Sequence, residues 1–571
     1  MLGGLPASRA AKALSTASAG ARVLTRAGVV RPYGPGVLAG LAVTLRRWGT
    51  GAAGGFSSLA TRAPHQVGLV DELGELTWAD LVGRAQSLAR ALAGLGVGEG
   101  DRVALLCRNH RGFVETTIAV SMLGADVLYL NTAFAGPQLR DVLARDAPAV
   151  VVHDEEFTPA LLGIEDGVED GGDGGGAGTE PAAVRVVAWT DTDAPGAVTT
   201  EQLIASHERG PLTPPGRNGR TVILTSGTTG TPKGAPRAEA GIDAGVSLLS
   251  ALPLRAGWRT HVAAPLFHTW GYGHLALSML LGSTLVLARR FEPQACLDLL
   301  RRERCDSFVV VPVMLQRILA LPEEQLAAAD LSRVQVVASS GSALPGDLPL
   351  TWMDRFGDRL WSTYGSTEVA YASVASPQDL RAAPGTAGRP PWNTEVRVLG
   401  DDLAPVPRGT TGRIFVGNGL LFEGYTGGGS KEVVDGLMAT GDVGRVDEAG
   451  RLVVEGRDDD MIVSGGENVF PQEVEDCIAR MPGVAEVAVV GVADPDFGQR
   501  LRAFVVAAGA PHAGAAGGGG PTAEEVQQHV RDNLARYKVP RDVVRLDALP
   551  RNATGKVLKR ELPHPETSPE P

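Results

Sequence analysis

The segment Thr-Ser-Gly-Thr-Thr-Gly-Thr-Pro-Lys-Gly at residues 225–234 constrains this chain more than any other feature of its sequence. It directly follows the apolar run 222–224, so a buried strand leads into a turn rich in glycine and hydroxyl groups. Glycine lets backbone N–H groups face an anion, and Lys233 adds a positive charge, which together predict a phosphate-binding loop. A Walker A loop is excluded, because Gly234 follows the lysine where Ser or Thr is needed. The alternative, a flexible linker, rarely follows a buried strand.

Six further segments appear downstream in order: 265–271 (Pro-Leu-Phe-His-Thr-Trp-Gly), 341–345 (Gly-Ser-Ala-Leu-Pro), 364–368 (Tyr-Gly-Ser-Thr-Glu), 440–442 (Thr-Gly-Asp), 456–468 and 550–556 (Pro-Arg-Asn-Ala-Thr-Gly-Lys). With the loop, they resemble the signature motifs of the adenylate-forming, or AMP-binding, superfamily of acyl-CoA synthetases, adenylation domains and luciferases. The resemblance covers residues 52–562. On these motifs the chain is identified as a member of the acyl-CoA synthetase, or fatty-acid–CoA ligase, family.

The length of 571 residues and the hydrophobic content of 44% allow more than one domain core. The resemblance implies an α/β fold, with a large multi-subdomain N-terminal adenylation domain at 51–458 and a small α+β C-terminal domain at 459–562 on a hinge. We expect a basic N-terminal extension at 1–50 and a short tail at 563–571. The glycine-rich segment 163–184 is expected to be a disordered surface insertion.

Hydrophobic spacing predicts the first elements of the large domain. Apolar residues recur every three or four positions in 76–95, which predicts an amphipathic helix that ends at Gly96. A strand at 103–107, a helix at 113–122 and a strand at 127–130 should follow. This alternation is typical of a layered α/β domain.

Charge and cysteine content exclude several functions. The net charge of −12 argues against a nucleic-acid-binding protein. Four cysteines without a CxxC pair predict neither a zinc site nor a disulfide framework, and they fit a cytoplasmic protein.

The first 70 residues differ, because they contain eight arginines or lysines and no acidic residue. Three interpretations stay open: peripheral contact with the inner face of an anionic membrane, a packed or frayed extension, and a transit peptide. The apolar run 37–45 is too short to span a bilayer, which needs ~20 residues.

The resemblance assigns the nucleotide site residue by residue. Thr228 and Lys233 act in catalysis, and Glu368 both acts in catalysis and binds Mg²⁺, a hard cation that prefers carboxylate oxygen. Asp442 suits the ribose because a carboxylate accepts hydrogen bonds from two hydroxyls. The residues implied to bind ATP or AMP are Thr225, Ser226, Gly227, Thr229, Gly230, Gly341, Ser342, Ala343, Tyr364, Gly365, Thr367, Asp442 and Arg457.

The family also implies a moving C-terminal domain. Lys556 is the catalytic residue expected to bridge the substrate carboxylate and the α-phosphate during adenylation. Asp459 is the expected hinge, and Gly465 and Gly466 are expected to leave space for the pantetheine arm of CoA.

The predicted reaction activates a carboxylic acid, expected to be a medium- or long-chain fatty acid, to acyl-AMP and then to acyl-CoA. ATP and CoA are the co-substrates. His268 and Trp270 either line the acyl pocket or form a packed aromatic cluster. Two other functions stay open: a ligase that loads a carrier-protein phosphopantetheine, and an inactive membrane-associated binding protein. The oligomeric state is not predicted.

Overall fold

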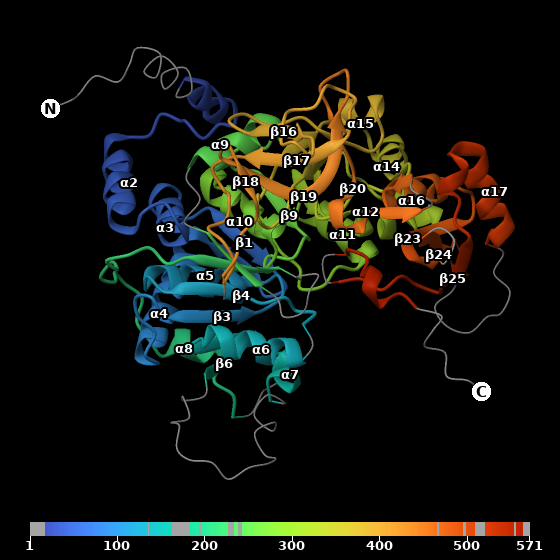
Figure 1. Cartoon of the computed structure of the whole chain (residues 1–571). Helices are drawn as coiled ribbons and strands as arrows, with labels where there is room; N and C mark the ends of the chain where they lie inside the picture. The colour runs from blue at the N-terminus through green and yellow to red at the C-terminus, as the bar shows by residue number, and fades with distance from the viewer. Residues whose placement is uncertain are drawn as a thin grey trace, which may run out of the picture.

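The computed structural model describes residues 18–134, 136–162, 183–192, 196–225, 233–237, 242–426, 428–464, 467–494, 498–508, 520–552 and 555–563. Within them the chain forms four β-sheets flanked by helices, with the C-terminal sheet at one end of the molecule and α2 at the other (Figure 1). No helix of this part of the chain is both long and apolar enough to cross a membrane.

Sheet A has eight strands, parallel through its centre and antiparallel at each edge. In spatial order these are β14 (Ser373–Ala375), β13 (Leu360–Tyr364), β12 (Val336–Ser339), β11 (Ser307–Val310), β9 (Arg259–Val262), β10 (Thr284–Val286), β1 (Val67–Asp71) and β2 (Gly74–Thr77).

Sheet B has six strands, with only the last pair antiparallel. In spatial order these are β6 (Val184–Trp189), β5 (Val150–Asp154), β3 (Arg102–Leu106), β4 (Asp126–Tyr129), β7 (Thr221–Thr225) and β8 (Lys233–Arg237).

Sheets C and D lie on either side of residue 459 in the sequence. Sheet C contains β15 (Thr386–Gly388), β20 (Leu452–Arg457), β19 (Leu437–Val446), β17 (Gly412–Gly417) and β16 (Glu395–Leu399), with β18 (Val433–Val434) paired to β19. Sheet D contains β22 (Glu467–Val469), β21 (Ile462–Ser464), β24 (Gly498–Ala507) and β23 (Val484–Asp494), with β25 (Asp542–Arg545) paired to β24. A separate apolar core, with Val474, Val489 and Val526 fully buried, supports sheet D.

The largest apolar core joins sheets A and B and includes the fully buried Trp78, Phe113 and Phe308. The helices are α2 (Pro35–Trp48), α3 (Ala52–Arg62), α4 (Trp78–Gly94), α5 (Arg111–Met122), α6 (Gly136–Asp146), α7 (Thr158–Leu162), α8 (Thr200–Ala205), α9 (Ile242–Ala251), α10 (Thr269–Leu281), α11 (Pro293–Arg302), α12 (Pro312–Leu319), α13 (Glu323–Ala328), α14 (Leu348–Phe356), α15 (Pro377–Ala382), α16 (Pro471–Ala479) and α17 (Ala523–Asn533).

The predicted alternation of helix and strand in the large domain is confirmed by α4, β3, α5 and β4. Helix α4 begins where the Thr77 hydroxyl accepts a hydrogen bond from the Asp80 backbone, which satisfies one free N–H of the first turn. Most of the expected insertion at 163–184 lies outside the described residues. Its last residue was assigned wrongly, because Val184 pairs with Val150 and begins β6.

Candidate active site

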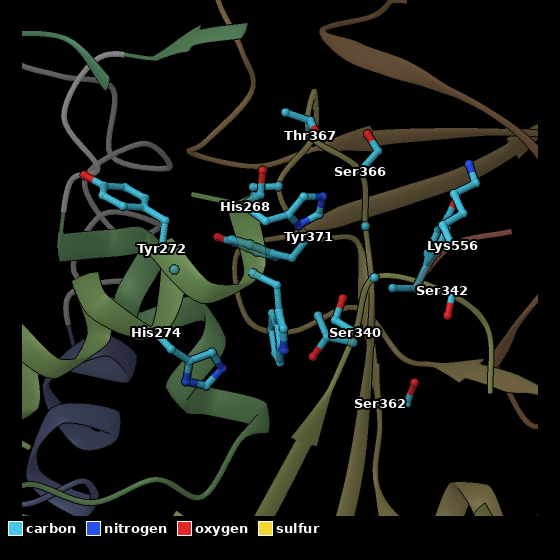
Figure 2. Close-up of a pocket in the computed structure, with 18 of the residues that line it drawn as sticks. His268, Tyr272, His274, Ser340, Ser342, Ser362, Ser366, Thr367, Tyr371 and Lys556 are labelled. Atoms are coloured by element: carbon cyan, nitrogen blue, oxygen red, sulfur yellow. The ribbon is translucent and has the colours of Figure 1, made fainter. Parts of the chain in front are cut away.

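A cavity of about 1060 Å³ joins the motif residues of both halves of the chain. Figure 2 shows Lys556 on one side of it and His268, Tyr272 and His274 on the other. The predicted site residues on its wall are Gly341, Ser342, Ala343, Tyr364, Gly365, Thr367, Glu368, Asp442, Arg457, His268, Trp270 and Lys556. Widely separated motifs therefore meet in one place.

Asp442 and Arg457 face each other because β19 and β20 pair at this register. The Tyr364 hydroxyl donates a hydrogen bond of 2.5 Å to Asp442 Oδ2, and Arg457 Nη1 lies 3.7 Å from Asp442 Oδ1. Burial raises the pKa of Asp442, while Tyr364, Arg457, Lys556 and Lys431 oppose that rise. This carboxylate can accept hydrogen bonds from a sugar, as predicted for the ribose.

Glu368 is held by two hydroxyl donors. Ser366 Oγ donates to Oε2 at 2.8 Å, and Tyr425 Oη donates to Oε1 at 2.7 Å. These bonds fix a carboxylate that lines the cavity, and each oxygen keeps lone-pair capacity. The arrangement fits Mg²⁺, which is commonly bound through one or two carboxylates, several waters and substrate phosphates.

The predicted phosphate-binding loop joins β7 to β8. Thr225, the last residue of β7, pairs with Lys233, the first residue of β8. The Gly234 amide donates a hydrogen bond to Thr426 Oγ1 at 2.9 Å. Lys233 is exposed and is not on the cavity wall, but its ammonium lies 5.3 Å from the centroid of the Tyr425 ring that contacts Glu368. The predicted contacts Ser226, Gly227, Thr228, Thr229 and Gly230 lie outside the described residues.

The loop that carries Lys556 docks on the N-terminal part of the chain. Gly555 has φ +79°, and a Cβ there would lie only 2.4 Å from Val313 Cγ1 at the start of α12. The Lys556 amide donates to Asn552 Oδ1 at 2.9 Å, which shapes the turn. Lys556 borders the cavity, and its charge opposes the rise in the pKa of Asp442 and helps to lower the pKa of His268.

His268 and Trp270 stand at the first turn of α10. Burial, together with the Lys556 charge, lowers the pKa of His268 to about 4, so its imidazole is neutral at physiological pH. The Trp270 indole donates to the Val310 carbonyl at 3.1 Å and meets the His274 ring edge-on at 4.5 Å. The Trp270–His274 pair is packed and borders the cavity, and the role of His268 and Trp270 in an acyl pocket stays a prediction.

Asp459 lies between two sheets. It is the middle residue of a short 3₁₀ turn, Asp458–Asp460, between β20 of sheet C and β21 of sheet D. Gly465 and Gly466, the predicted CoA-access residues, lie outside the described residues, between the paired Ser464 and Glu467. The change of sheet supports the proposed hinge position.

Sequence reasoning missed three residues of the site. Tyr425 and Ser366 orient Glu368, and Lys431 lies beside Asp442, with its Nζ 3.2 Å from where a Gly441 Cβ would stand. Ser366 lies inside a recognised motif, where its position two residues before Glu368 was the available signal. Tyr425 and Lys431 lie outside the motifs, so only the fold brings them to the site.

A cavity that combines a carboxylate suited to a sugar, a carboxylate suited to Mg²⁺ and a lysine from the C-terminal part of the chain is typical of adenylate-forming enzymes. Sequence comparison gives the family. The model of the AMP-binding enzyme family matches residues 56–426, and that of the AMP-binding enzyme C-terminal domain matches residues 473–556. The chain belongs to the AMP-binding enzyme family and is an adenylate-forming acid–CoA ligase.

Relatives within this family act on different acids. Feruloyl-CoA synthase of Amycolatopsis sp is 34% identical over 510 residues, covering 88% of this chain and 96% of that protein. Long-chain-fatty-acid–CoA ligase FadD13 of Mycobacterium tuberculosis is 30% identical over 494 residues, covering 85% and 92%. The crystal structure of the anthranilate CoA ligase AuaEII in complex with anthranoyl-AMP has 25% identity and a TM-score of 0.78, covering 89% and 95%.

Proposed function

We propose that this ligase activates a medium- or long-chain fatty acid. The main observation in support is that the cavity continues from His268 along α10, where Ala276, Leu277 and Met279 line it. Burying such a chain would contribute about 0.8 kcal/mol per methylene group. The fatty-acid ligase among the relatives supports this choice. An aryl acid is the second candidate, because feruloyl-CoA synthase and the anthranilate ligase are also similar to this chain.

In the first half-reaction, a carboxylate oxygen of the acid attacks the α-phosphorus of ATP, and pyrophosphate leaves. We propose that Lys556 bridges the carboxylate and the α-phosphate, since it borders the same cavity as His268 and Asp442. Asp442 and Arg457 would hold the ribose, and Thr367 the α-phosphate. Bound Mg²⁺, held by Glu368, would supply positive charge for the phosphates.

We propose that residues 225–230 and Lys233 hold the β- and γ-phosphates, and that residues 341–343 with Tyr364 and Gly365 surround the adenine. The hairpin that presents Lys233 ends beside Tyr425, the tyrosine bound to Glu368. That proximity supports a shared role of the loop and Glu368 around one triphosphate.

In the second half-reaction, the thiolate of CoA attacks the acyl carbon, a thioester bond forms and AMP leaves. The Lys556 loop is docked on α12 in this structure, which supports assignment to the adenylation arrangement. We propose that rotation about Asp459 then replaces this loop by the segment around Gly465 and Gly466. The proposed domains are therefore 51–458 and 459–562.

The test is pyrophosphate release with ATP and Mg²⁺ across straight-chain acids from acetate to palmitate and several aryl acids, with and without CoA. A maximum among the medium or long chains, accelerated by CoA, would support the proposal. A maximum among the aryl acids would select the second candidate. Release without CoA stimulation, combined with acyl transfer to a carrier protein, would select the carrier-protein ligase.

Peripheral membrane contact and cytoplasmic location stay predictions. The features that support contact are the exposed Leu38 and Val43 of α2, with Arg46 and Arg47 in the last turn of the helix. Sedimentation of the chain with anionic vesicles tests it, and a lack of binding would reject it.

A further inference from the structure

The acid cavity follows helix α10 from its first turn to its last. Of residues 269–280, all but Gly271, Leu275 and Ser278 border the cavity. These three are spaced by four and three residues, so they form the single face of α10 that is turned away from it. Eleven residue steps of α-helix span ~16 Å. The cavity therefore extends well beyond the space that an acyl-adenylate headgroup needs.

Three other helices form the distal part of this cavity. Gly245 and Leu248 of α9 border it, as do Gly55 and Ser58 of α3. Helix α3 packs closely on α10, since a Cβ on Gly55 would lie only 2.8 Å from Met279 Sδ. The spacings of three residues again place each pair on one helical face. The distal cavity is thus lined by helices and is continuous with the adenylation site.

Helix α2 closes the distal end. Leu41 and Leu45, one helical turn apart, both border the cavity. Helix α2 is fixed to α3 by a hydrogen bond of 3.2 Å between the hydroxyls of Thr44 and Thr61. Close packing accompanies it, because a Cβ on Gly40 would lie 2.9 Å from Thr61 Cγ2. The position of the two leucines is therefore set by packing.

The arginine that borders this end of the cavity already makes hydrogen bonds within the protein. Arg62 borders the same region, but its guanidinium donates to the Leu280 carbonyl at 3.2 Å and to the Tyr33 hydroxyl at 3.4 Å. The side chains that α2 contributes here are aliphatic. This end of the cavity suits the apolar end of an acid better than a second carboxylate.

Helix α2 precedes the part of the chain that the family model matches, residues 56–426. None of its residues is fully buried, so its leucines are not needed to fill the main core. Leu41 and Leu45 both border the cavity, although Leu45 is 41% exposed, whereas Leu38 and Val43 are 52% and 65% exposed and do not border it.

We propose that α2 forms a distal subsite for the tail of the acid, with Leu41 and Leu45 as specificity-determining residues. The inference rests on the proposed function and deepens it by giving the length of the acyl tail that the cavity holds. At about 1.3 Å of extended chain per C–C bond, the ~16 Å along α10 hold a tail of about a dozen carbons. Shorter acids end before α2 and do not contact it.

The first test narrows the subsite with Leu41→Trp and compares dodecanoate with hexanoate. We expect kcat/KM for dodecanoate to fall at least tenfold, mainly through KM, and that for hexanoate to stay within twofold. Val43→Trp, on the exposed side of the same helix and two residues from Leu41, is the matched control and should change neither. Retained hexanoate activity shows that the variant folds. Equal effects of Leu41→Trp on both acids would overturn the subsite.

The second test does not depend on turnover. A 12-carbon acid with a photoreactive diazirine at its far end is bound to the full chain with ATP, irradiated and mapped by tryptic digestion. We expect the label in the peptide 27–46, which contains α2, and less of it there in Leu41→Trp. Label only in other peptides would overturn the subsite. If the wild type turns over no fatty acid, the proposed function itself fails; dodecanoate turnover that Leu41→Trp leaves unchanged rejects only the subsite.

Discussion

Lys556 is the residue that we propose to act directly in the first half-reaction. Its side chain comes from a loop near the C-terminus, yet its charge acts on His268 of the α10 region and on Asp442 of β19. Both neighbours belong to the N-terminal part of the chain. The proposed adenylation site would therefore be complete only while this loop is docked.

We expect Lys556→Ala to lower acid-dependent pyrophosphate release by about 100- to 1000-fold, the usual effect of removing a preorganised donor. Conversion of supplied acyl-AMP to acyl-CoA should stay within threefold, because Lys556 has no proposed role in that step. The two half-reactions are measured separately on the same preparation. Equal losses in both would remove the proposed role.

The sequence, through the family motifs, predicted most of the site residues that lie in motifs, with Ser366 as the exception. Glu368, Asp442 and Lys556 all reach the cavity wall. It did not predict Tyr425 or Lys431, since a lone tyrosine or lysine carries no local pattern. Their proximity to Glu368 and Asp442 depends on the pairing of distant strands and loops.

At the scale of elements, the Lys556 loop and α12 form a contact that depends on a glycine. Gly555→Ala adds a methyl group 2.4 Å from Val313 Cγ1 and places alanine at φ +79°. We expect adenylation to slow at least tenfold and the use of supplied acyl-AMP to be unchanged.

The control for Gly555→Ala is Gly409→Ala, which has φ +80° but open space around the added methyl group. Both variants place alanine at a positive φ, which costs about 1–2 kcal/mol of free energy. The difference between their adenylation rates therefore isolates the contact with Val313. Val313→Ala should restore part of the adenylation rate of Gly555→Ala. A loss of similar size in the Gly409 variant would argue against docking as the cause.

Helix α16 contacts the N-terminal part through a carboxyl group with an unusual pKa. Burial, with help from Glu475, raises the pKa of Asp476 from 3.8 to about 6, although Gln472 and the Gly346 amide donate hydrogen bonds to it. Arg480 of the same segment lies 3.4 Å from Asp347, beside Gly346. The contact between the two parts is thus partly electrostatic.

Asp476 binds its proton more tightly when folded, so its contribution to stability is present below about pH 4 and is lost as the pH rises to about 6. We expect Asp476→Asn to remove this loss and to stabilise the protein above pH 6 by up to about 3 kcal/mol. Urea unfolding at pH 4.5 and 7.5 measures the difference in unfolding free energy between the variant and the wild type. Asp435→Asn, at a side chain 77% exposed, is the control and should shift neither curve.

Element prediction succeeded where one physical signal dominated. The 3.6-residue period of α4 is a local signal, and this helix appears in the structure. The boundary at Val184 was wrong because a single valine after a glycine-rich segment carries too little pattern. Its strand forms only because β5 offers a parallel partner.

At the scale of the whole molecule, two separate sheets and two separate cores meet at the cavity. β20 ends at Arg457 in sheet C, and β21 begins at Ile462 in sheet D. The few residues between them must absorb any rotation that exchanges the Lys556 loop for the 465–466 segment. The sequence predicted the domain boundary at residue 459 only through the family resemblance, since the three aspartates at 458–460 alone indicate a solvated charge run.

Asp459→Pro tests the hinge directly. Proline fixes φ near −65°, which suits a position in the 3₁₀ turn of this structure but hinders a large backbone change there. We expect pyrophosphate release to stay within threefold of the wild type and acyl-CoA formation from supplied acyl-AMP to fall at least tenfold. Asp459→Ala, which removes the carboxylate and keeps φ free, should leave both half-reactions nearly unchanged. Equal loss of both in the proline variant would mean that the turn is needed for folding or binding, and the rotation would have to occur elsewhere in the chain.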